Sequence, residues 1–198
     1  MITGLIVAGV AAILVMNFQP ASDPKPIKTT ELATASPPIG ANVQENPIGD
    51  PVTKNHVEVA AVWLAGVAMD GMPSASNDVI HLEADIKSTA DNPNGFAKSE
   101  FIPYLKVKYV LTDVSGGKTL DSGEMSPMIA SDGLHYGASV AMPKPGSYRL
   151  TYHIEPPSAG GLGRHVGPGG VAPWWEPFDA SFDWTVEPTK PAALAGNR

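Results

Sequence analysis

Three histidines, one methionine and one glutamate in this chain could together bind a transition metal. The 198-residue sequence contains no cysteine, which excludes disulfide bonds and thiolate metal sites. A site for a soft or borderline metal must therefore use imidazole, thioether and carboxylate groups. The candidate ligands are His81, Glu83, Met128, His135 and His165.

His81 and Glu83 are two positions apart in a segment, residues 79–87, where apolar and polar residues alternate. This period of two predicts a strand, on which both side chains point to the same face about 7 Å apart. We expect that face to be the one away from the core. The pair can offer two ligands to one ion, and a solvated polar face is the alternative interpretation.

Met128 and His135 lie on either side of a turn signal, Ser131-Asp132-Gly133. A turn there folds the thioether back towards the imidazole. This soft, mixed ligand pair suits copper better than magnesium or calcium. The alternative is that Met128 only fills the core, which is the commoner role of methionine.

His165 lies in a glycine-rich segment, residues 160–167, which is typical of a loop. Loops held on a rigid scaffold often carry ligand groups, and an exposed, inert histidine is the alternative. We interpret His56 as incidental and His153 as exposed on its strand. The sequence contains no phosphate loop, G-x-S-x-G or H-E-x-x-H motif, so we predict no catalytic residue.

An antiparallel β-sandwich is the scaffold that the rest of the sequence predicts. The 20 glycines and 20 prolines disfavour long helices. Alternating apolar residues mark several strands between turn signals, and we predict an all-β, immunoglobulin-like sandwich over residues 56–188. The predicted core includes Leu82, Val107, Tyr109, Leu150, Phe182 and Trp184.

The two ends of the chain have a different character. Residues 1–18 form an uncharged apolar run, which predicts a helix acting as a signal peptide or membrane anchor. Residues 19–55 are rich in proline and small polar residues and predict a disordered tether, and residues 189–198 predict a frayed tail. We therefore expect the domain to be exported to the outside of the cytoplasmic membrane, either free after cleavage of residues 1–18 or anchored by them. The net charge of −7 argues against a nucleic-acid partner.

Five segments, in order, resemble the periplasmic Fe(II) transport protein family, the copper-binding accessory proteins of bacterial iron uptake. They are HLEADI at 81–86, NPNGF at 92–96, MIASDGLHYG at 128–137, GRH at 163–165 and WEPF at 175–178. The resemblance implies an immunoglobulin-like fold, a homodimer with its metal site near the dimer contact, and an inner-membrane iron permease as partner. It also implies a site of one methionine and three histidines with a nearby glutamate, which match Met128, His81, His135, His165 and Glu83.

Three classes of function follow from these observations. The first is a periplasmic accessory protein that binds copper and hands iron, as Fe(II) or Fe(III), to a permease. A copper-handling protein without an iron role is a variant of this first class. The second class is an enzyme, a copper-dependent ferroxidase or iron reductase. The third class is a purely structural sandwich, which the five matched segments disfavour.

Overall fold

The computed structural model describes residues 44–70 and 78–188, and within them the regular secondary structure is almost entirely β-strand. The one helical element in this part is a short 3-10 helix, η1 (Pro157–Gly160). No helix in these ranges is long and apolar enough to cross a membrane. The predicted helix at 1–18 and the tail at 189–198 lie outside the described residues.

The strands are β1 (Asn46–Pro47), β2 (Val52–Lys54), β3 (Val57–Ala65), β4 (Val79–Ser88), β5 (Lys106–Asp113), β6 (Lys118–Ala130), β7 (Gly133–Ala141), β8 (Gly146–Glu155) and β9 (Phe178–Val186).

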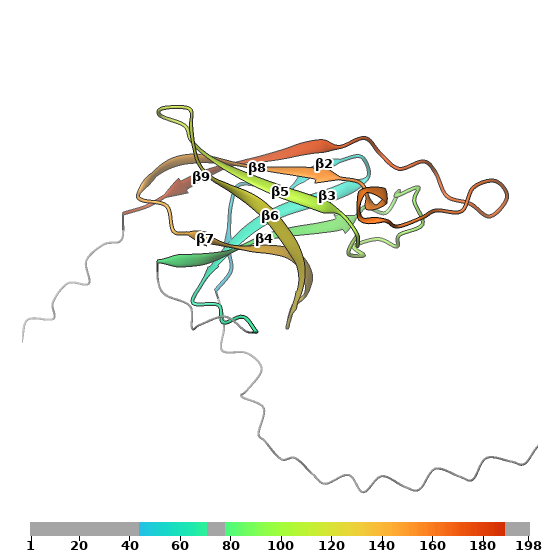
Figure 1. The fold of residues 1–198 in the computed structure, drawn as a ribbon, viewed down its shortest axis with the longest axis horizontal. Helices are drawn as coiled ribbons and strands as arrows, with labels where there is room; N and C mark the ends of the chain where they lie inside the picture. The colour runs from blue at the N-terminus through green and yellow to red at the C-terminus, as the bar shows by residue number, and fades with distance from the viewer. Residues whose placement is uncertain (1–43, 71–77, 189–198) are drawn as a thin grey trace, which may run out of the picture. The chain divides into compact units, whose positions relative to one another are not determined.

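These strands form one continuous antiparallel sheet with the order β1-β3-β4-β7-β6-β5-β8-β9, and β2 also pairs with β3. The all-β, antiparallel prediction is thus confirmed, but the sandwich of two separate sheets is not what the chain forms. The long strand β6 pairs with β5 as far as Met125 and with β7 from Ser126 onward. A strand that changes partner in this way forms the corner of a curled sheet, and Figure 1 shows β6 bending between the two halves.

The core lies between the two halves of the curled sheet and follows the predicted alternation. All six predicted core residues are buried, with exposures of 6% or less. Strand β9 alternates strictly between buried and exposed positions. The buried Tyr152 on β8 donates a hydrogen bond of 2.8 Å to the backbone carbonyl of Glu83 on β4, which joins the two halves. Burying each large apolar side chain contributes about 1.5–3 kcal/mol to stability.

The folded part begins earlier than residue 56, where the sequence predicts the end of the tether. Strands β1 and β2 both pair with β3. Between them, Ile48 is 1% exposed and its backbone N–H donates to the Ala61 carbonyl at 2.8 Å. Strands of two or three residues are too short to show a hydrophobic period, which is why composition alone assigns this segment to the tether.

Candidate metal centre

Strand β4 carries two of the candidate ligands into the interior of the protein. It lies between β3 and β7 in the sheet. His81 and Glu83 are each only 4% exposed, so the face predicted to point away from the core is also buried. The alternation correctly places both side chains on one face, but neighbouring strands and the curl of the sheet cover it. A buried carboxylate and a buried imidazole need partners, because desolvation of either is costly.

His135 on β7 completes a compact group of three buried ligand atoms. Its Nε2 lies 3.3 Å from Nε2 of His81 and 3.3 Å from Oε1 of Glu83. The same Glu83 oxygen lies 3.5 Å from Nε2 of His81. Nitrogen and oxygen donors about 2.0–2.1 Å from one tetrahedral ion are about 3.3 Å apart. The three atoms are therefore spaced as donors to one ion are spaced.

Met128 faces the same group from β6. It is the cross-strand partner of His135, and the two-residue turn after Ala130 closes the β6–β7 hairpin at the predicted position. A Cβ atom on Gly137 would lie 2.6 Å from Nε2 of His81 and 3.0 Å from Sδ of Met128. The imidazole and the thioether thus border one small space, and glycine at position 137 keeps it open.

Burial sets the protonation of the three buried groups. Burial, together with the nearby carboxylates of Asp132, Asp85 and Glu45, raises the pKa of Glu83 to about 7. Burial also lowers the pKa of His81 and of His135 below the usual range of histidine. Both imidazoles are therefore neutral at pH 7, which is the form that binds metals.

His81 also has a buried ring nitrogen on the side away from the ligand group. Its Nδ1 atom is buried and has no hydrogen-bond partner among the described residues. An unsatisfied buried polar atom costs about 1–3 kcal/mol, and the described residues contain one other such side-chain atom, Nε1 of Trp175. The neutral donor set and the space beside Gly137 together fit a metal-binding role.

A second group of potential ligands shares Glu83 with the first. Carboxylate oxygens of Glu45, Glu83 and Asp132 lie within 4.8 Å of one another. Asp132 lies in the β6–β7 turn, and Glu45 directly precedes β1. Sequence reasoning missed Glu45, because it lies in the segment assigned to the tether and belongs to no periodic pattern. The two groups place buried nitrogen donors next to exposed oxygen donors.

His165 lies apart from both groups. It is exposed on the loop of residues 161–177 between η1 and β9, and within 44–70 and 78–188 it joins neither ligand group. Figure 1 shows this loop, in orange and red, projecting away from the β6–β7 hairpin. In the described part of a single chain, His81, Glu83, Met128 and His135 thus lie together, and His165 lies apart from them.

The raised pKa of Glu83 predicts a stability cost in the metal-free protein. An unfolded glutamate titrates near pH 4.3, whereas folded Glu83 titrates near 7. Between these values the folded state binds more protons, so this group lowers stability as pH rises through the window. Glu83→Gln removes the titration. Relative to the parent protein, the unfolding free energy of Glu83→Gln should therefore increase by up to about 3 kcal/mol between pH 4.5 and pH 8.

Urea unfolding with a chelator present, at several pH values, measures this shift. Glu58→Gln, at an exposed position on β3, is the matched control and should show a constant difference. A pH-independent difference for Glu83→Gln would contradict the burial of a titrating carboxylate in this group.

Comparisons with known proteins show which proteins this chain is similar to. The sequence profile described as "Fe2+ transport protein" matches residues 42–187. A UPF0423 protein of Brucella abortus (strain 2308) is 44% identical over an alignment of 158 positions, and the match covers 76% of this chain and 86% of that protein. Among solved structures, FetP from uropathogenic Escherichia coli strain F11, recombinantly expressed in the periplasm of another E. coli strain, is 44% identical with a TM-score of 0.67. The match covers 73% of this chain and 97% of that one. Copper-reconstituted P19 from Campylobacter jejuni is 40% identical with a TM-score of 0.68, covering 74% and 99%.

Proposed function

We propose that this chain, which belongs to the Fe2+ transport protein family, is a periplasmic copper- and iron-binding protein of iron uptake. The observation that carries the proposal is the buried group of His81, Glu83 and His135, whose ligand atoms are 3.3–3.5 Å apart. The copper in P19 supports copper as the metal, and the recombinant expression of FetP in the periplasm supports the periplasm as the compartment. In this proposal residues 1–18 export the domain or anchor it to the inner membrane, and an iron permease there receives the iron.

Copper is the metal that the buried donor set fits best. His81 and His135 would hold it through neutral imidazole nitrogens and Met128 through its sulfur, while Glu83 would act as a further ligand or orient the imidazoles. Imidazole binds both copper oxidation states, and a thioether favours Cu(I). Bound copper supplies one-electron redox chemistry. The protein's contribution is to exclude water and to keep the donors in place.

Iron is the proposed cargo, and the exposed carboxylates are where we place it. Oxygen donors from Glu45 and Asp132 suit a harder ion than copper. Because Glu83 belongs to both groups, the cargo would bind beside the copper site. A second candidate is iron at the buried group itself, since two histidines and one carboxylate are also a common ligand set for non-haem Fe(II). The sulfur of Met128 favours copper there.

Metal analysis followed by an iron oxidation assay tests this function. Protein purified without added metal should contain copper, and the copper-loaded protein should bind added iron. Stoichiometric oxidation or none supports a carrier, whereas many turnovers per copper would support the alternative, a ferroxidase or iron reductase. Protein that retains neither metal at micromolar concentrations would contradict the proposal.

His165 enters this proposal through a second copy of the chain. One chain leaves this exposed histidine outside its own ligand group, and the family resemblance implies a homodimer with the metal site near the contact. We propose that His165 of a second copy adds the third imidazole to His81 and His135. The acidic β6–β7 turn that carries Asp132 would then lie near the contact.

Mixing two defective variants tests the exchange of His165. His81→Ala and His165→Ala should each bind copper weakly alone. A mixed dimer should regain one intact site, because the His165→Ala chain keeps its own His81 and receives His165 from the His81→Ala chain. Copper titration of the mixture, after subunit exchange, should therefore recover tight binding. If His165 bound copper within its own chain, no mixture of the two variants would recover tight copper binding.

A further inference from the structure

The loop that carries His165 is tied together at its base. The backbone N–H of Val171 donates to the carbonyl of His165 at 3.2 Å, and the Arg164 guanidinium donates to the carbonyl of Val171, also at 3.2 Å. A Cβ atom on Gly170 would lie 2.5 Å from the His165 carbonyl, so only glycine permits this closure. The position of His165 therefore depends on the position of Val171.

Asn94 binds the residues that directly follow Val171. It lies in the loop between β4 and β5 and is 7% exposed. Its Nδ2 donates to the carbonyls of Ala172 and Pro173 at 2.9 and 3.1 Å. The N–H of Ala172 returns a hydrogen bond of 3.1 Å to the carbonyl of Pro93. Both N–H groups of this buried side-chain amide therefore donate hydrogen bonds, and both bonds hold the His165 loop to the β4–β5 loop.

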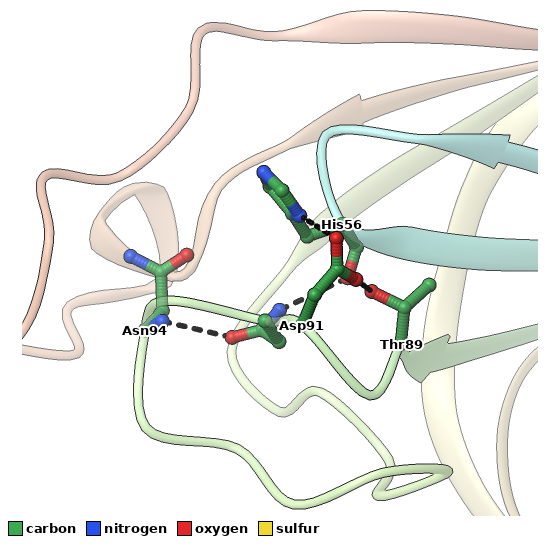
Figure 2. Close-up of polar contacts among 5 residues, drawn as sticks. His56, Thr89, Asp91 and Asn94 are labelled. Atoms are coloured by element: carbon green, nitrogen blue, oxygen red, sulfur yellow. Dashed lines mark hydrogen bonds and ion pairs between the residues drawn. The ribbon is translucent and has the colours of Figure 1, made fainter.

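The β4–β5 loop is itself fixed to the turn between β2 and β3 (Figure 2). The carbonyl of His56 accepts from Nδ2 of Asn92 at 3.0 Å, and the His56 ring pairs with Asp91 at 2.9 Å. Oδ1 of Asn92 then accepts from the backbone N–H of Asn94 at 2.9 Å. His56, which the sequence suggests is incidental, is thus the first member of a chain of contacts that ends at His165.

We propose that Asn94 is a positioning residue for His165, setting where its imidazole is presented to the metal centre. The inference rests on the proposed role of His165 as a ligand. An exposed loop without strand pairing samples many conformations, and fixing it before the ion arrives removes that ordering cost from binding. Without the Asn94 amide, His165 would keep its chemistry but lose its fixed position.

A double-mutant cycle on copper affinity tests this role in the full-length protein. Asn94→Ala should weaken Cu(II) binding about 10–100-fold, the usual loss when a residue that orients a ligand is removed. In a His165→Ala background the same substitution should change copper affinity little, because the group that it positions is absent. The Cu(II) electron paramagnetic resonance spectrum of Asn94→Ala should show weakened coupling to one nitrogen, as that of His165→Ala does.

A core variant separates positioning from general destabilisation. Val107→Ala, in the core on β5, should lower the melting temperature while leaving copper affinity unchanged. Equal losses from Asn94→Ala in both backgrounds, or no loss in either, would overturn the inference. If His165→Ala alone bound copper like the parent, the ligand role of His165 would fail first, and the role of Asn94 would fail with it.

Discussion

Replacing His135 with alanine should lower copper affinity by more than about 100-fold, which is the largest effect that we expect from any single substitution. Removing a residue that only orients a ligand typically costs 10–100-fold, and the loss of a direct donor should exceed that. His135 is the one buried donor on β7, and its Nε2 lies 3.3 Å from both His81 and Glu83. No other imidazole in the described part of this chain stands close enough to replace it.

Competition with a chromophoric chelator measures the loss for Cu(I) and Cu(II) separately. Both should weaken, because imidazole binds both oxidation states. The matched control is His153→Ala on β8, since that histidine is partly exposed and pairs with Asp179 at 2.7 Å, outside the ligand group. It should bind copper like the parent. Unchanged copper affinity in His135→Ala would remove the metal site from this group.

Replacing Gly137 with alanine should weaken copper binding about 10–100-fold without removing any donor. The added Cβ would lie 2.6 Å from two atoms of the His81 ring and 3.0 Å from Sδ of Met128. The Met128 chain is flexible and can move aside, but the His81 ring is 4% exposed on a central strand and has little room to move. The shifted ring would no longer meet the geometry that it shares with His135 and Glu83.

Gly116→Ala is the control for this substitution, because a Cβ atom at Gly116 would meet nothing within 4 Å. Overpacking at Gly137 should also cost the metal-free protein about 1–3 kcal/mol of stability, which urea unfolding measures in the same samples. A Gly137→Ala variant with reduced stability but parental copper affinity would show that the space beside Gly137 serves packing only.

Much of the scaffold is predictable because the signals for it are local. Alternation identifies the long strands and the core, since successive side chains on a strand point to opposite faces. The Ser131-Asp132-Gly133 signal places the β6–β7 turn, and the turn then fixes Met128 opposite His135. The curl of the sheet is not predictable in this way. A period of two marks a strand but not its partner, and β6 has two partners, exchanged after Met125.

The sequence by itself determines that His81 and Glu83 share a face, because their spacing of two matches the strand period. Only the tertiary structure decides that this face is buried, that His135 stands 3.3 Å from both groups, that Glu45 joins Glu83 and Asp132, and that His165 remains outside. The physical reason is that spacing along a strand is a property of the backbone. Burial and convergence depend instead on contacts between segments far apart in the chain, and no local pattern specifies them.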